Sequence, residues 1–206
     1  MTAADSWEQV PTLRGEFVLL RPTVPADARP LAAAYDDEGT LEYFPFGVES
    51  DPPSAATVEY ALASGRQVLT QVDLRSGAVC GSTSLHQHDR QRRQLTIGHT
   101  WLSASVRGGP VNVEAKLLLM THAFDTLRAV RVQWNVDDRN ARSRRAVLGL
   151  GATEEGVLRR HARRRDGTWR DTVVFSVLDT EWPEVRERLT ARVHARTGGR
   201  QEWASR

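Results

Sequence analysis

The sequence predicts a single α/β domain, in which a mixed sheet of modest size carries helices. Short apolar runs with strand-like alternation recur along the 206 residues, and longer stretches with helical spacing stand between them. Two of the runs are joined by the hairpin signal Arg75-Ser76-Gly77. Hydrophobic residues make up 40% and charged residues 26% of the chain, which is ordinary globular composition. A chain of this length typically buries one such core.

The N-terminal half predicts a strand, two helices and a group of antiparallel strands. In order, these are a strand over 16–22, helices over 26–35 and 55–64, and strands over 67–74, 78–85 and 94–102. Pro25 opens the first helix and Asp27 lies in its first turn, where both residue types are favoured. Residues 45–53, rich in proline, glycine and aspartate, predict a loop.

Beyond residue 102 the apolar period changes repeatedly between that of a helix and that of a strand. The pattern predicts a helix over 111–127, a strand over 130–136, a helix over 141–150, strands over 155–160 and 171–178, and a C-terminal helix over 181–194. Gly151 is placed to end the second of these helices, and Asp166-Gly167 to turn the last hairpin. The expected organisation is an N-terminal extension over 1–15, a domain over 16–183, and a helix with a mobile tail over 184–206.

Composition excludes several classes of protein. The single cysteine, Cys80, cannot form an internal disulfide, which fits a reducing, cytoplasmic setting. We expect no signal peptide, and no stretch approaches the roughly eighteen apolar residues of a membrane span. Net charge is only +2 and nearly every base is arginine, with Lys116 the single lysine. Overall basicity is therefore weak evidence for nucleic-acid binding.

The most informative segment is Arg107-Gly108-Gly109-Pro110-Val111-Asn112, which follows a strand and begins the long helix. Consecutive glycines let the backbone approach a ligand closely. The N–H groups and dipole of a helix start favour an anion, and the arginine adds a charged donor. The pyrophosphate of a nucleotide-like cofactor is the natural ligand. The alternative is a plain glycine turn with proline at the first helical position.

A second polar cluster follows the next strand. Asn140 and Ser143 share one face of a helix start, and Gly149-Leu150-Gly151-Ala152 ends that helix. An amide and a hydroxyl there could bind the amide-rich arm of a cofactor, or the hydroxyl could supply a proton. The alternative is that both are solvated helix-start residues.

These segments together resemble the GNAT superfamily of N-acetyltransferases, most closely its RimJ/RimL-type branch. The resemblance runs from about Glu16 to Pro183 and is carried by IGHTWL (97–102), RGGPVN-VEAKLLL (107–119), DDRNARSRRA (137–146), LGLGA (148–152), GVLRRH (156–161) and DTVVFSVLD (171–179). It implies a mixed, mostly antiparallel twisted sheet flanked by helices, with two central strands that splay apart. It also implies acetyl-CoA as co-substrate and no need for a metal.

The resemblance implies a role for each part of the site. Acetyl-CoA would lie between the strands over 94–102 and 130–136, with backbone groups near Trp101 and Leu102 bonding its pantetheine arm. One of these N–H groups would polarise the thioester carbonyl. The loop 107–112 would bind the pyrophosphate.

On the other side of the cofactor, Asn140 would face the arm and Ser143 would protonate the departing thiolate. The acceptor, a primary amine, would attack the thioester directly in a ternary complex. Cys80 as an acyl-carrying nucleophile is disfavoured, because it has no basic neighbour in the sequence.

Three positions depart from the family's pattern. Pro110 stands where the loop usually has glycine, and it lacks an N–H donor. Thr96 stands where many members carry a glutamate that serves as base through water. Val147 replaces the tyrosine acid of many members, an absence typical of the branch that moves the acid role to Ser143.

The general base therefore stays open. Glu114 lies near a helix N-terminus, which stabilises its anion and lowers its basicity, and a structural role is the alternative. His99 and His161 are better matched to neutral pH, although each could be a structural or surface histidine. An amine of low pKa would need no base.

Substrate and partners also keep alternatives. The amine belongs to a protein or peptide N-terminus, or to a small molecule such as an antibiotic or its precursor, and its pocket would be shaped by the loop 43–53. Pro110 and Thr96 would fit a catalytically weak acyl-CoA-binding module instead. The arginine-rich hairpin over 159–170 could serve a ribosome- or RNA-associated protein, but a solvated hairpin is favoured, so nucleic acid is not expected. His86 and His88 form a weak metal signal, and a homodimer is left open.

Overall fold

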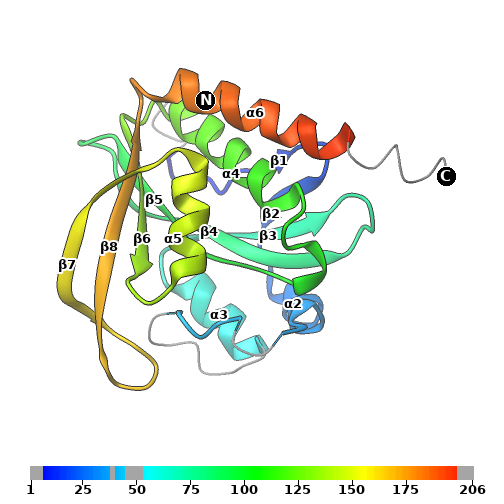
Figure 1. Cartoon of the computed structure of the whole chain (residues 1–206). Helices are drawn as coiled ribbons and strands as arrows, with labels where there is room; N and C mark the ends of the chain where they lie inside the picture. The colour runs from blue at the N-terminus through cyan, green and yellow to red at the C-terminus, as the bar shows by residue number, and fades with distance from the viewer. Residues whose placement is uncertain (1–6, 38–39, 45–52, 199–206) are drawn as a thin grey trace.

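The computed structural model describes residues 7–37, 40–44 and 53–198 and shows an eight-stranded sheet (Figure 1). Its order is β1-β2-β3-β4-β5-β6-β8-β7, and all neighbours are antiparallel except the parallel pair β5 and β6. The strands are β1 (Leu13–Arg14), β2 (Val18–Pro22), β3 (Gln67–Asp73), β4 (Val79–Asp89), β5 (Gln94–Leu102), β6 (Arg131–Asp137), β7 (Thr153–Arg163) and β8 (Trp169–Leu178). The predicted mixed, mostly antiparallel sheet is confirmed.

Helices cover both faces of the sheet. They are the 3-10 turn η1 (Pro25–Asp27), α2 (Ala28–Ala34), α3 (Ala55–Ala63), the 3-10 turn η2 (Ala104–Val106), α4 (Val111–Thr121) with the π-helical turn η3 (His122–Thr126), α5 (Ala141–Leu150) and α6 (Trp182–Gly198). The main apolar core joins α4 and α6 to one face, whereas a smaller cluster joins α2 and α3 to Trp101 (Figure 1). The sheet therefore has an α4 face and an α2/α3 face.

Most elements lie where their periodicity predicts them. β5 and α5 have the expected bounds, and Gly151 ends α5 with a left-handed φ of 96°, which glycine adopts without steric cost. β4 and β7 extend beyond the expected 78–85 and 155–160. The added residues of β4 are mostly polar, so they carry no apolar alternation. The expected loop over 45–53 lies outside the described residues except for Pro53.

The two ends of the described chain pack on the same core as residues 16–183. Trp7 is 6% exposed, and its indole Nε1 donates to the carbonyl oxygen of Leu127 at 3.1 Å. β1 pairs with β2. On α6, the residues that pack into the main core are Val185, Leu189 and Val193. The described parts of the segments 1–15 and 184–206 thus contribute side chains to the same core as residues 16–183, and residues 199–206 lie outside the described part of the chain.

The central strands β5 and β6 separate after a short contact. They pair over only three positions, from Gln94 opposite Arg131 to Thr96 opposite Gln133. β5 also gains a residue relative to β4 near His99, whose φ is 49°. Gly81 on β4 opposes this region so closely that a Cβ there would lie 2.1 Å from the Trp101 carbonyl oxygen. The predicted splay is therefore present, and β5, one of its two strands, carries a bulge at this point.

Candidate active site

The splay opens into a cavity of about 620 Å³ between β5 and β6. Loop and helix starts at α4 and α5, together with the hairpin β7–β8, complete its wall. Most of the predicted site residues line it, namely His99, Trp101, Leu102, Arg107, Gly108, Asn112, Asn140, Ser143 and His161. Gly109, Val111 and Glu114 do not. Segments far apart in the sequence thus converge on one hollow.

The start of α4 places the unpaired side-chain oxygen of Asn112 at this cavity. The helix begins at Val111, and the Glu114 N–H is the first to bond back, to the carbonyl oxygen of Pro110 at 2.9 Å. Amide groups before Glu114 therefore precede the hydrogen-bonded ladder. The side-chain Oδ1 of Asn112 is buried without a partner. Because buried polar atoms are nearly always paired, this atom indicates a ligand or water in the cavity.

The side chain of Arg107 already has partners, contrary to the expectation that it is available to a phosphate. Its Nε donates to the carbonyl oxygen of Leu102 at 3.0 Å, Nη2 to Thr40 Oγ1 at 2.7 Å, and Nη1 pairs with Asp37. The guanidinium thus fastens the segment that follows α2 to the end of β5. Any anion at this loop would meet backbone N–H groups rather than this side chain.

Asn140 and Ser143 form the N-terminal cap of α5 and also line the cavity. Asn140 is the N-cap of α5, and its Oδ1 accepts from the Ser143 N–H at 2.9 Å. This cap leaves the amide nitrogen of Asn140 and the hydroxyl of Ser143 available, and both residues line the cavity. Within the described residues the Ser143 hydroxyl makes no hydrogen bond. A proton donor therefore stands at the cavity wall.

His99 and His86 form a neutral pair on the α2/α3 side of the sheet. Their rings are 5.0 Å apart, and Phe44 lies 5.9 Å from His99. Burial, with help from the charge of Arg66, lowers the pKa of His86 to about 4 and that of His99 to about 3. The expectation that His99 is matched to neutral pH is wrong, because a ring with so low a pKa binds protons weakly. His88 does not share this cluster: Gln87 has a φ of 51°, and His88 contacts Trp7 instead.

His161 is the remaining histidine of the cavity wall. It lies exposed on β7, and its Nδ1 is 3.2 Å from the hydroxyl of Thr172 on β8. That contact fixes one ring nitrogen and leaves Nε2 for a second partner. Of the three predicted base candidates, His161 alone combines an exposed side chain with a position on the cavity.

Glu114 is a structural residue rather than a base. It is 5% exposed, and its carboxylate accepts the backbone N–H groups of Glu16, Phe17 and Val18 at 2.8, 2.7 and 2.8 Å. These bonds join α4 to the start of β2. The base role is therefore corrected, since the oxygens point away from the cavity and are already occupied.

Lys116 is a site residue that the sequence interpretation missed. It is 4% exposed, lines the cavity, and donates from Nζ to Thr83 Oγ1 at 3.2 Å and Thr100 Oγ1 at 2.6 Å. Burial lowers its pKa to about 7. The available signal was helical spacing, because Lys116 lies four residues after Asn112 and therefore on the same face of α4.

Replacing Lys116 with methionine is expected to remove a pH-dependent part of the stability. The folded pKa of about 7 lies below the ordinary lysine pKa of 10.5, so between these two pH values the unfolded chain binds more protons and stability rises with pH. From pH 7.5 to 8.5 the wild type should gain up to about 1.4 kcal/mol relative to Lys116→Met. Urea unfolding at the two pH values measures this. Parallel pH dependences for both proteins would show that Lys116 keeps an ordinary pKa.

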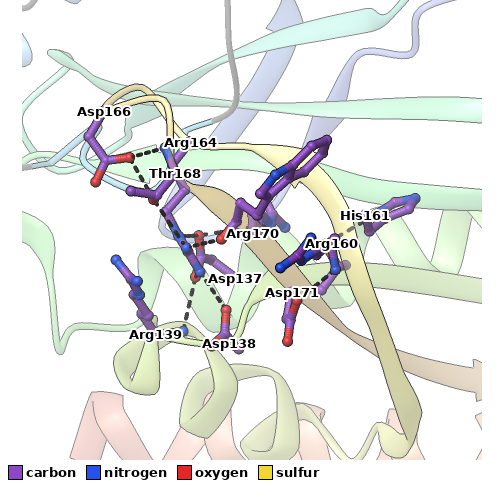
Figure 2. Close-up of polar contacts among 12 residues, drawn as sticks. Asp137, Asp138, Arg139, Arg160, His161, Arg164, Asp166, Thr168, Arg170 and Asp171 are labelled. Carbon is purple, nitrogen blue, oxygen red and sulfur yellow. Dashed lines mark hydrogen bonds and ion pairs between the residues drawn. The ribbon is translucent and has the colours of Figure 1, made fainter.

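The arginine-rich hairpin directs two of its cations inward (Figure 2). Arg164 is 8% exposed and binds Asp137 at 2.8 and 3.0 Å and Asp138 at 2.6 Å. Arg170 is also 8% exposed and lines the cavity. Arg163, by contrast, lies over the exposed ring of Trp169 at 4.2 Å. The hairpin is therefore a partly buried ion-pair network, and it offers fewer cations to a nucleic acid than its sequence suggests.

The described ranges 7–37, 40–44 and 53–198 contain neither a candidate metal-binding cluster nor a membrane-spanning helix. No group of three or more histidine, cysteine, aspartate or glutamate side chains there could hold a metal ion. No helix in those ranges is both long and apolar enough to span a bilayer.

Comparison with known proteins identifies relatives of this fold and sequence. Residues 18–153 match the family model described as "Acetyltransferase (GNAT) domain". The chain is 32% identical over 114 residues to the Bacillus subtilis (strain 168) protein named "Putative ribosomal N-acetyltransferase YdaF", and the match covers 53% of this chain and 58% of that relative. The chain thus spans less than two thirds of that relative's length.

Solved structures share the fold along most of their length. A GCN5-related N-acetyltransferase from Brucella melitensis superimposes with a TM-score of 0.83 at 28% identity, over 90% of this chain and 86% of that one. Mycobacterium smegmatis RimJ, solved in complex with CoA-disulfide, gives 0.74 at 23% identity, over 91% and 96%. At that identity the RimJ likeness shows the fold alone.

Proposed function

Because the chain belongs to the GNAT acetyltransferase family, we propose that it transfers the acetyl group of acetyl-CoA to a primary amine. The observation that carries the proposal is the cavity in the splay of β5 and β6. Its size, about 620 Å³, falls within the range of ligand sites, and strand, loop and helix termini supply polar groups to its wall. The ribosomal relative supports the RimJ/RimL-type branch and a cytoplasmic setting.

Orphaned polar atoms in the cavity fit the polar arm and phosphates of acetyl-CoA. Asn112 Oδ1 and Trp134 Nε1 are both buried without partners, and both residues line the cavity. The backbone at the start of α4 would bind the pyrophosphate through N–H groups and the helix dipole. The free amide nitrogen of Asn140 and backbone groups of β5 near Trp101 and Leu102 would bond the pantetheine arm.

The chemistry assigned to this chain's residues is modest. The amine nitrogen attacks the thioester carbonyl carbon while a β5 backbone N–H stabilises the charge on the carbonyl oxygen. As the carbon–sulfur bond breaks, the Ser143 hydroxyl would give its proton to the departing sulfur and would take a proton back from solvent. His161 takes the proton that the amine loses, because it is the candidate base that remains at the cavity with one ring nitrogen unassigned. Acetyl-CoA supplies the activated acyl group.

The test is a screen of thiol release from acetyl-CoA against N-terminal peptides and small amines, with mass analysis of the products. A mass increase of one acetyl group on an amine, with stoichiometric thiol release, is the expected result. If acetyl-CoA binds and no amine in a broad panel is acetylated, the chain is an acyl-CoA-binding module instead.

Replacing Pro110 with glycine is expected to tighten acetyl-CoA binding about three- to tenfold, because it adds an N–H donor beside the phosphate-binding turn. Pro110 precedes the first residue of α4 with a φ of −74°, which glycine also adopts. Calorimetric titration with acetyl-CoA measures the change. Pro110→Ala is the matched control, since it adds the N–H without the flexibility of glycine. Unchanged affinity in both variants would show that other amides already satisfy the pyrophosphate.

A further inference from the structure

Arg170 is a buried guanidinium that the protein leaves only partly satisfied. It lies on β8, is 8% exposed and lines the cavity. Its Nη2 donates to the carbonyl oxygen of Asn135 at 3.0 Å, whereas its Nε is buried with no hydrogen-bond partner. Arginine carries five N–H donors, so most of those of Arg170 find no acceptor among the described residues. Leaving such donors buried and unpaired is costly.

The nearest carboxylate, that of Asp137, accepts no hydrogen bond from Arg170. Nε of Arg170 lies 3.9 Å from Asp137 Oδ2, beyond hydrogen-bond distance. Both oxygens of Asp137 are held by Arg164, and Figure 2 shows Arg164 reaching between Asp137 and Asp138 with Arg170 alongside. Desolvation lowers the pKa of Arg170, although the nearby charge of Asp137 acts in the opposite direction. The N–H groups of Arg170 that have no hydrogen-bond acceptor could be satisfied by a bound anion.

Strand alternation places Arg170 on the side opposite α4. Val173, Phe175 and Val177 of β8 belong to the main core with α4 and α6. Because successive side chains of a strand point to opposite faces, Thr172 and Arg170 point toward the α2/α3 face. Thr172 contacts His161 on that side. Arg170 therefore lies on the face of the sheet opposite the start of α4, which is the proposed pyrophosphate site. The acceptor would enter on the face that carries Arg170.

A second cation, Arg66, lies near the same region. Arg66 donates from Nε to Ser64 Oγ at 2.7 Å and forms no ion pair with a described residue. The charges of Arg66 and Arg170 both lower the pKa of His99, so both lie near that ring. Arg66 also lines a smaller pocket of about 60 Å³ that shares Phe44, His99 and Trp101 with the cavity. The region around His99 therefore combines two cations with neutral histidines.

We propose that the acceptor amine carries a carboxylate, which binds the free N–H groups of Arg170 inside the cavity. The inference rests on the proposed acetyl transfer, whose acceptor it narrows to amino acids, their analogues or peptides with an acidic group near the amine. A carboxylate matches the planar guanidinium with two parallel hydrogen bonds. The cations also disfavour the ammonium form of the amine and so favour the nucleophile.

The experiment compares matched amine pairs, each an ω-amino carboxylate and its primary amide, over a series of chain lengths with acetyl-CoA. At the chain length that fits, the acid should exceed its amide about 10- to 100-fold in kcat/KM, as expected for a charge-assisted bond to a buried cation. In Arg170→Gln this ratio should fall to about threefold or less. Arg170→Lys, which keeps the charge but not the planar fork, should fall between the two.

Arg163→Gln is the matched control, because Arg163 lies on the same hairpin and its guanidinium covers the exposed ring of Trp169. It removes the same charge outside the cavity and should keep the wild-type acid-to-amide ratio. Thermal unfolding of each variant confirms that the proteins compared are folded. Equal use of acid and amide by the wild type, or a ratio that survives Arg170→Gln, would overturn the anion site and leave acetyl transfer intact.

A binding measurement separates this outcome from failure of the proposed function. Butyrate, which has no amine, is titrated into protein saturated with CoA and followed by nuclear magnetic resonance. Binding that is lost in Arg170→Gln but kept in Arg163→Gln supports the anion site even if no amine is acetylated. Absence of binding, or equal binding by the two variants, counts against it whatever the enzyme assay shows.

Discussion

Ser143→Ala is expected to lower kcat about 100-fold and to change the dissociation constant of acetyl-CoA by less than about threefold. The hydroxyl lines the cavity and makes no hydrogen bond to the described residues, so its loss costs the fold little. Without it the sulfur must leave as a thiolate or take its proton from water. Steady-state kinetics with the amine found in the screen, together with calorimetric titration of acetyl-CoA, measure the two quantities.

The outcome separates an acid from a helix-start residue. The cap of α5 uses the backbone N–H of Ser143, which alanine retains, so α5 should stay intact. Ser76→Ala, in the exposed turn between β3 and β4, is the control for a serine outside the cavity and should leave kcat unchanged. A Ser143→Ala enzyme with wild-type kcat would end the acid role, and equal losses in kcat and acetyl-CoA affinity would indicate a binding role instead.

The main elements of the fold could be predicted because their signals are local. The nine residues of β5 and the ten of α5 each carry their own apolar period, and Gly151 carries the backbone preference that ends α5. β1 has only two residues, and what defines it is its pairing with β2 rather than any pattern of its own. Trp7 likewise is held by contacts with Leu127 and Gln67, distant in the sequence.

The site divides in the same way. Asn112, Asn140 and Ser143 could be placed because helix starts that follow adjacent parallel strands meet at one edge of a sheet. The partners of Arg107, Asp37 and Thr40, come from a segment far earlier in the chain. No local sequence pattern predicts these contacts. For Arg170, strand alternation predicts a position on the polar face of β8, opposite its apolar face. Alternation does not show that neighbouring segments also bury this polar face, so the burial of Arg170 could not be predicted.

Glu114 is a base candidate by its place in the sequence, but in the structure its carboxylate is bound to three backbone N–H groups. Replacing it is expected to have the largest effect on stability. Glu114→Ala removes the acceptor of three backbone N–H groups, and two of these hydrogen bonds are buried. Unsatisfied buried donors cost about 1–3 kcal/mol each, and water can reach some of them, so we expect a loss of about 3–5 kcal/mol in unfolding free energy. Urea denaturation at constant pH measures it.

The same variant decides between an anchor and a base. As an anchor, Glu114 fixes β2 against α4, and a protein kept folded at low temperature should turn over within about threefold of the wild type. Glu114→Gln can keep an oxygen acceptor for the N–H groups of Phe17 and Val18, but its NH₂ group then faces the backbone N–H of Glu16, so it should also destabilise. Gly15 packs against the same carboxylate: a Cβ there would lie 2.3 Å from Glu114 Cδ, so Gly15→Ala should lower stability without touching the cavity. A stable Glu114→Ala protein with kcat reduced by a hundredfold would restore the base that the geometry rejects.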